Sequence, residues 1–197
     1  FCMRVAKKVR NALPNLKIIH YVAPSVWAWR PERAAKMSKD VDHVLALLPF
    51  EPPYMEAEGM TCEFVGHPAV SSPHVSKKAQ EKFKKKYILH NGPIITVLPG
   101  SRIGEIKRMC PIFNKVLNNI EKLYPDSQFI LPVASSVEKD VVNAVKSWNI
   151  KPLLLLNEGK DLKEIEHDKF ITYSISSAAL ATSGTVSLEL AAKNCPM

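Results

Sequence analysis

The sequence lacks the features that mark several common classes of protein. No segment approaches the ~18 consecutive apolar residues of a membrane-spanning helix, so we do not expect an integral membrane protein. We expect no signal peptide, because an amphipathic, charged stretch follows Phe1 directly. The chain begins without Met and stops at Met197, so we expect it to be cut at both ends.

Metal and redox motifs are also missing. The cysteines (Cys2, Cys62, Cys110 and Cys195) form no Cys-x-x-Cys pair, and the six histidines form no His-x-x-x-His pair. Zinc sites and thioredoxin-like motifs need such close pairs. We therefore expect no metal, and reduced, mostly buried thiols in a cytoplasmic protein.

The composition is that of a folded, basic protein. The 197 residues suffice for one large domain or two small ones. The formal charge of +8 indicates a partner with negative charge: nucleic acid, anionic lipid or a phosphorylated small molecule. Composition alone leaves all three open. Much of the excess lies in residues 77–86, which also suits the solvated face of a helix.

Apolar runs alternate with helical patterns along the chain. The runs predict strands at 16–23, 43–48, 61–65, 93–98, 128–133 and 152–156. The intervening patterns predict helices at 2–13, 31–40, 53–58, 77–87, 105–124 and 137–148. Buried strands separated by helices are typical of parallel α/β sheets. We predict two Rossmann-like domains, residues 1–70 and 77–197, joined by a linker at 71–76 and facing each other across a cleft.

Two local patterns refine these predictions. The helix at 105–124 should bury an apolar face that runs from Ile106 to Leu123. Ser135 and Glu138 have the spacing of a capping box at the start of the next helix.

The segment 98–102 (LPGSR) follows a predicted strand and precedes a long helix. Gly100 would let backbone amides point outward, Ser101 adds a hydroxyl, and Arg102 can bind a phosphate through paired hydrogen bonds. The segment is neither Gly-x-Gly-x-x-Gly nor a Walker loop, so ordinary NAD and ATP motifs are absent. Taken alone, it is equally compatible with a plain turn.

A second turn of small residues, Ser183-Gly184-Thr185, opens the last helix. Its hydroxyls and amides suit a diphosphate, and Glu189, four residues after Thr185, could accept hydrogen bonds from ribose hydroxyls. The alternative is that Gly184 only caps the helix and that Glu189 is solvated. Two phosphate-type turns in one domain favour binding.

Residues 24–31 (PSVWAWRP) place Trp27 and Trp29 around an alanine beside Arg30. Such an exposed aromatic cluster can cover a sugar or meet acyl chains at a membrane interface. In the alternative, one tryptophan belongs to the core. For His67, in FVGHP, we prefer a structural hydrogen-bonding role.

Together these segments resemble lipid-A-disaccharide synthase, a two-domain glycosyltransferase of the GT-B type. The match is carried by residues 21–37, 45–54, 64–68, 98–105 and 182–197, in the order and with the gaps of that family. The resemblance implies a UDP-2,3-diacylglucosamine donor, a 2,3-diacylglucosamine 1-phosphate (lipid X) acceptor, and inversion to a β-1′,6 linkage. It implies no cofactor and leaves the oligomeric state open, with an oligomer possible.

The resemblance also assigns residues. UDP would be bound by Gly100, Ser101, Arg102, Pro132, Val133, Ser183, Gly184, Thr185 and Glu189, with the loop at 132–134 on the uracil. The acceptor or an anionic membrane surface would contact Ser25, Trp27, Trp29 and Arg30. The protein would then be peripheral on the inner face of the cytoplasmic membrane.

The chain departs from the family pattern in ways that limit its chemistry. The general base is unknown and is expected upstream of Phe1, and the family continues beyond Met197. Ser177 replaces a family aspartate, which should affect local stability more than chemistry. We therefore expect the fragment alone to bind UDP weakly and to be inactive as an enzyme.

Two other functions compete with this interpretation. A UDP-sugar epimerase of the same fold would share the two turns but would have no need of the Trp-Ala-Trp segment. A basic nucleic-acid-binding module fits the charge, but no binding motif appears, and we expect no nucleic acid as partner.

Overall fold

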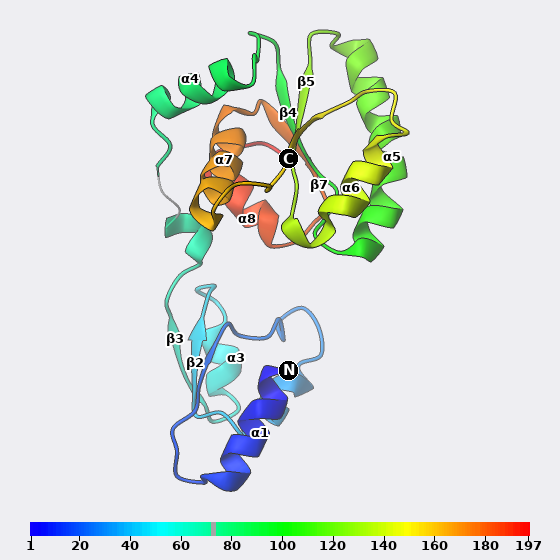
Figure 1. Cartoon of the computed structure of the whole chain (residues 1–197). Coiled ribbons are helices and arrows are strands. Elements are labelled where there is room, and N and C mark those ends of the chain that lie inside the picture. The colour runs from blue at the N-terminus through cyan, green and yellow to red at the C-terminus, as the bar shows by residue number, and fades with distance from the viewer. Residues whose placement is uncertain (72–73) are drawn as a thin grey trace. The chain divides into compact units, whose positions relative to one another are not determined.

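The computed structural model describes residues 1–71 and 74–197, which form an α/β fold with two parallel sheets (Figure 1). The chain divides into two compact units, Phe1–Ser71 and Ser72–Met197. The predicted fold class is thereby confirmed. Residues 72–73 of the predicted linker lie outside the described part of the chain. No helix among the described residues is long and apolar enough to cross a bilayer.

The first unit holds a three-stranded parallel sheet in the order β1-β2-β3. Its elements are α1 (Cys2–Ala12), β1 (Ile19–Tyr21), α2 (Glu32–Met37), β2 (His43–Ala46), α3 (Pro52–Glu56), β3 (Thr61–Phe64) and a 3₁₀ turn (Pro68–Ser71). The central strand β2 contributes Val44 and Ala46 to the core, where both are fully buried. Met37 and Met55 pack around them.

The prediction that all three strands of this unit are buried was wrong for the two edge strands. In β1, Ile19 is 62% exposed and Tyr21 51% exposed, and in β3 Phe64 is 49% exposed. An edge strand has a hydrogen-bonding neighbour on one side only, so β-branched and aromatic composition does not by itself ensure burial.

The second unit is a four-stranded parallel sheet in the order β6-β5-β4-β7. Its strands are β4 (Ile94–Leu98), β5 (Gln128–Pro132), β6 (Leu153–Leu155) and β7 (Ala178–Ala181). Its helices are α4 (Lys77–Lys86), α5 (Ile103–Leu123), α6 (Glu138–Val145), α7 (Leu162–Ile175) and α8 (Thr185–Ala192), with a 3₁₀ turn at Ser135–Val137.

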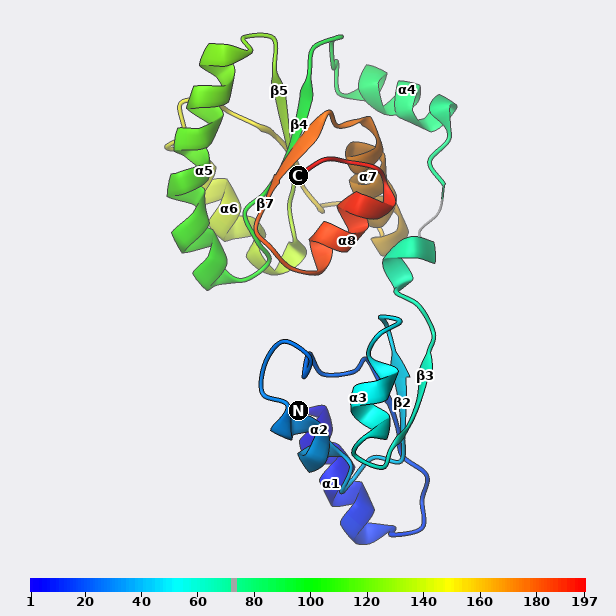
Figure 2. The same ribbon diagram turned by 180° about the vertical axis from the view of Figure 1, so that it is seen from behind.

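Helices cover both faces of this sheet, as Figures 1 and 2 show, with α5 and α6 on one face and α7 and α8 on the other. Successive strand residues point to opposite faces. Accordingly, Leu98 packs with Phe170 and Leu190, whereas its neighbour Val97 packs with Phe113 of α5. The sheet is thus the middle layer of three.

Two local predictions for this unit were wrong. Ser135 makes no capping box, because a 3₁₀ turn occupies Ser135–Val137 and α6 begins only at Glu138, whose carboxylate binds Asn157 instead. The apolar face of α5 is buried at Ile106, but Leu123 in its last turn is 75% exposed.

The thiols are all free, and the prediction that they are mostly buried holds for two of them. Cys110 and Cys195 are buried, Cys62 is half-buried and Cys2 is exposed. Burial raises the pKa of Cys110 to about 11, so this thiol stays protonated and packs as a small apolar side chain.

Asp42 links α1 to the segment that leads into β1. Its Oδ2 accepts hydrogen bonds from the amide of Ile18 (2.8 Å) and from Nη2 of Arg10 in α1 (2.6 Å). These two bonds, the amide first, hold the pKa of the Asp42 carboxyl below its usual value. The ionised carboxylate therefore stabilises the fold.

Replacing Asp42 with Asn should destabilise the first unit by about 1 kcal/mol at pH 7. Because the folded pKa is lowered, this stabilisation is complete above the ordinary carboxyl pKa of about 4 and is lost as the pH falls through the folded value. Urea unfolding at several pH values measures the unfolding free energy. A Trp148→Phe background leaves the fluorescence of Trp27 and Trp29 to report on the first unit. Glu58→Gln, an exposed carboxylate of the same unit, is the matched control. If the difference in unfolding free energy between wild type and Asp42→Asn were the same at pH 3 as at pH 7, this account would be contradicted.

Candidate functional site

A cavity of about 460 Å³ opens in the second unit at the carboxyl ends of its strands. Residues that follow β4, β5, β6 and β7 line it, together with the inward side of α7. The cavity brings together all but one of the residues predicted for UDP: Gly100, Ser101, Arg102, Pro132, Val133, Ser183, Gly184 and Thr185. Its size is ordinary for a small-molecule site.

The two small-residue turns meet here because β4 and β7 are paired in parallel. Leu98 lies opposite Ala181 in the register, and the amide of Thr182 donates to the carbonyl of Leu98 (2.9 Å). Both strands therefore end at the same level, and each is followed by a turn and a helix N-terminus. The hydroxyl Oγ1 of Thr182 is buried and has no hydrogen-bond partner among the described residues.

The Gly100 turn differs from its prediction in one respect. The amides of Ser101 and Arg102 do not point outward but donate to Oε2 of Glu105 (2.9 and 3.2 Å), which closes the first turn of α5. The Ser101 amide first, and then the Arg102 guanidinium, hold the pKa of the Glu105 carboxyl below its usual value. The turn thus favours an anion, and in this structure the anion is the Glu105 carboxylate.

The Gly184 turn is more open. Gly184 caps the N-terminus of α8 with extended backbone, and a methyl group built on it would meet no heavy atom within 4 Å. Ser183, Gly184 and Thr185 are all exposed along the cavity. The first amides of a helix have no acceptor within the helix, so this helix N-terminus suits a phosphate oxygen.

Three cations line the cavity, and each is paired with a carboxylate. Nη1 of Arg102 lies 2.7 Å from Glu105, but the Arg102 side chain is 81% exposed. The side chains of Lys160 and Lys169 are less exposed than that of Arg102. Sequence analysis predicted only the arginine.

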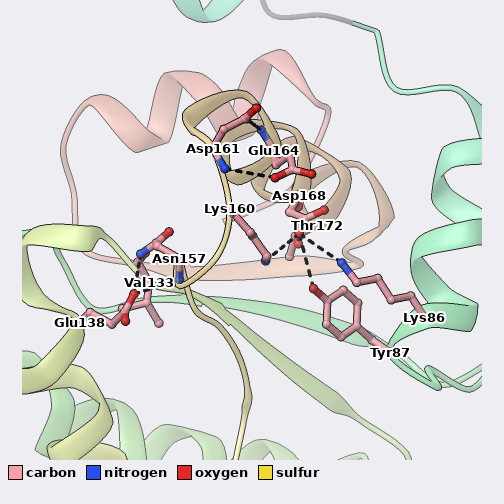
Figure 3. Close-up of polar contacts among 10 residues, drawn as sticks. All are labelled: Lys86, Tyr87, Val133, Glu138, Asn157, Lys160, Asp161, Glu164, Asp168 and Thr172. Carbon is pink, nitrogen blue, oxygen red and sulfur yellow. Dashed lines mark hydrogen bonds and ion pairs between the residues drawn. The ribbon is translucent and has the colours of Figure 1, made fainter.

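Figure 3 shows the side chains of Lys160, Lys86 and Tyr87 directed at the carboxylate of Asp168. Nζ of Lys160 lies 2.9 Å from Oδ2 of Asp168, Nζ of Lys86 lies 3.9 Å away, and the Tyr87 hydroxyl donates over 3.5 Å. Partial burial disfavours the charge of Lys160, but the bond to Asp168 outweighs it and raises the pKa of Lys160. Lys160 is therefore a fixed cation on the cavity wall.

Glu189 is the one predicted UDP-binding residue that does not line the cavity. Its carboxylate lies 3.1 Å from Nζ of Lys169, and Lys169 does line the cavity. The neighbouring Tyr173 is 1% exposed, and burial, with the charge of Glu189, raises the pKa of its hydroxyl. Lys169, and not Glu189, thus presents its charge to the cavity.

On the opposite side, the loops after β5 and β6 form a wall with apolar side chains. Pro132, Val133 and Ala134 come from one loop, and Leu156 with Asn157 from the other. Nδ2 of Asn157 donates to the carbonyl of Val133 (2.8 Å), which links the two loops (Figure 3).

The aromatic segment predicted for acceptor or membrane contact lies in the first unit, after β1. Trp29 is 63% exposed, with the Arg30 guanidinium 5.0 Å from its ring centre. Trp27 is 41% exposed and makes two contacts within the unit. Its ring packs edge-on against Phe50, with 5.1 Å between the ring centroids, and its Nε1 donates a hydrogen bond to the buried Glu51 (3.4 Å). Ser25 is exposed, and its carbonyl accepts from the amide of Trp29 (3.1 Å).

His67 has the structural role that was preferred for it, because its Nδ1 accepts a hydrogen bond from the amide of Ala69 (3.1 Å). Across residues 1–71 and 74–197, no three His, Cys, Asp or Glu side chains gather as a metal site would require.

Sequence analysis missed the contributions of α7 and of the loop before it. Asn157, Lys160, Asp168 and Lys169 all line the cavity. One local signal was available: Asp161 and Glu164 form a capping box, which marks the start of a helix immediately after Lys160.

Comparison with known proteins identifies the family. A model of the Lipid-A-disaccharide synthetase family matches residues 1–197. The chain belongs to this family. It is 45% identical over 197 residues to the lipid-A-disaccharide synthase of Rhodospirillum centenum, and 45% to that of Ruegeria pomeroyi. It is 40% identical to the lipid-A-disaccharide synthase of Rickettsia prowazekii.

These matches cover all of this chain but only part of each relative. The covered share is 47% of the Rhodospirillum protein and 49% of the other two. The chain therefore spans about half the length of the curated relatives it matches.

The two glycines around the first turn allow a matched test of its geometry. Gly100 has a φ of +126°, and a Cβ there would lie 2.6 Å from Cβ of Glu105, so Gly100→Ala should destabilise the second unit by about 1–3 kcal/mol. Gly104 lies in the first turn of α5 with open space around it, so Gly104→Ala should stabilise by about 0.5–1 kcal/mol. Urea unfolding followed by Trp148 fluorescence compares them. Equal effects of the two substitutions would show that the turn does not constrain Gly100.

Proposed function

We propose that this chain is the donor-nucleotide-binding portion, with part of the acceptor portion, of an inverting hexosyltransferase. The reaction would join UDP-2,3-diacylglucosamine to 2,3-diacylglucosamine 1-phosphate (lipid X), giving lipid A disaccharide 1-phosphate and UDP. The observation that carries the proposal is the meeting of the Gly100 and Gly184 turns in one cavity at the carboxyl ends of two adjacent strands.

The charge of the cavity supports a diphosphate ligand. Arg102, Lys160 and Lys169 line it with the acidic groups Glu105 and Asp168. All three cations are held by carboxylates and so offer charge at defined positions, and the exposed Arg102 guanidinium is accessible to a phosphate. The N-terminus of α8 adds partial positive charge.

These groups would serve the leaving group of the reaction. When the acceptor hydroxyl attacks the anomeric carbon, it loses its proton to a general base, the bond to the diphosphate breaks, and negative charge develops on UDP. Cations and amides fixed beforehand stabilise that charge without having to reorganise. The ribose would lie near Lys169 and Glu189, and the uracil against the wall formed by Pro132 and Val133.

Because the chain spans about half of its relatives, we propose that it binds UDP weakly and does not complete a turnover by itself. A UDP-sugar epimerase is the alternative that the cavity also accommodates. Acylated and unacylated UDP-sugars separate the two, since an epimerase has no use for acyl chains.

Gly184→Val tests the nucleotide site without disturbing the fold. The added side chain meets no protein atom within 4 Å of its Cβ but enters the cavity, so the Kd for UDP should rise about tenfold or more. Isothermal titration calorimetry measures the Kd, with circular dichroism as the folding check. Leu188→Ala, an exposed position on α8 outside the cavity lining, is the control. Unchanged UDP affinity in Gly184→Val, or no UDP binding by the wild-type chain, would refute the proposal.

We further propose that the aromatic segment of the first unit contacts acyl chains or the membrane surface, making the protein peripheral on the inner face of the cytoplasmic membrane. Trp29 and Arg30 fit this role, because an exposed indole beside a cation suits the interface between headgroups and acyl chains. The net charge of +8 would add attraction to anionic lipid.

Trp29→Ala should reduce co-sedimentation with anionic liposomes several-fold, since the exposed ring carries little of the fold. Tyr124→Ala, an equally exposed aromatic of the second unit, is the matched control and should bind as wild type does. The idea fails if both variants behave alike or if binding does not depend on lipid charge.

A further inference from the structure

Asn157 is held in one orientation by two partners. Its Nδ2 donates to the carbonyl of Val133 (2.8 Å) and to Oε2 of Glu138 (2.8 Å), and its backbone amide also donates to Oε2 of Glu138 (3.0 Å). Both hydrogens of the side-chain amide are therefore committed. Figure 3 shows Asn157 together with both of its partners.

This arrangement determines what Asn157 can offer to a ligand. Asn157 lines the cavity, and its remaining polar atom is Oδ1, which can only accept a hydrogen bond. No donor within residues 1–71 and 74–197 binds Oδ1. A carbonyl oxygen with no donor, at the rim of an otherwise apolar wall, favours a ligand that carries an N–H group there.

The surroundings favour a flat ligand. Val133, Ala134 and Leu156 line the cavity from the same two loops that Asn157 joins. The bond from Asn157 to Val133 fixes the spacing of those loops, and the Glu138 carboxylate fixes Asn157. A planar heterocycle can rest on the apolar groups while its edge reaches the oxygen.

Resting on the proposed function, we propose that Asn157 is the residue that selects the base of the nucleotide. Its Oδ1 accepts a hydrogen bond from the ring N–H of a pyrimidine imide, the N3–H of uracil. Glu138 is a positioning residue, which keeps the amide turned so that the oxygen, not the nitrogen, faces the base. No such ring N–H exists in cytosine, whose N3 is an acceptor and would be repelled.

The test compares three ligands on the purified chain by calorimetry: UDP, N3-methyl-UDP and inorganic pyrophosphate. The wild type should prefer UDP over N3-methyl-UDP by about tenfold, the effect of one hydrogen bond to a site that otherwise stays unpaired. Asn157→Ala should reduce this preference to about twofold or less while leaving the pyrophosphate Kd unchanged. A residue with only a structural role would weaken all three ligands together.

Variants of Glu138 separate positioning from contact. Glu138→Ala should lose most of the preference for UDP over N3-methyl-UDP. Glu138→Gln keeps a carbonyl oxygen as acceptor and should retain part of that preference. Asp140→Asn, another carboxylate on α6, is the matched control and should behave as wild type does.

The outcomes distinguish this inference from the function it rests on. If the wild type binds UDP and Asn157→Ala keeps the full preference over N3-methyl-UDP, the role of Asn157 is refuted and the nucleotide site stands. A loss of pyrophosphate affinity equal to that of UDP also refutes it. If the wild type binds neither UDP nor pyrophosphate, the proposed function fails and the base assignment fails with it.

Discussion

The parallel pairing of β4 with β7 is the interaction on which the site depends. The hydrogen bond from the Thr182 amide to the Leu98 carbonyl sets the two strand ends level, so the turns after them enter one cavity. The sheet that enforces this register is covered on both faces by buried side chains. A shift of the register would separate the Gly100 and Gly184 turns and remove the site.

Charge in the cavity is balanced in pairs rather than spread evenly. Glu105 restrains the Gly100 turn and Arg102, Asp168 restrains Lys160, and Glu189 restrains Lys169. Each carboxylate keeps a cation in place, which lowers the cost of ordering that side chain when a ligand arrives.

The sequence predicted the fold class and the two small-residue turns that line the cavity, because both follow from short patterns. Apolar runs mark strands such as β4 and β5, and a glycine after a strand marks a turn that a ligand can approach. The pattern did not show that the Glu105 carboxylate would accept hydrogen bonds from the amides of Ser101 and Arg102, because a capping contact depends on side-chain geometry. Lys160 and Asn157 were missed because their partners, Asp168 and Glu138, are 8 and 19 residues away and meet them only in the folded chain.

The central claim is that both turns bind the same nucleotide diphosphate. Amide chemical shifts recorded by NMR during a UDP titration test it most directly. The account predicts that the amides of residues 100–102 and 183–185 shift together, with one common Kd, while the first unit stays unchanged. Shifts confined to one turn, or centred outside the cavity, would contradict it.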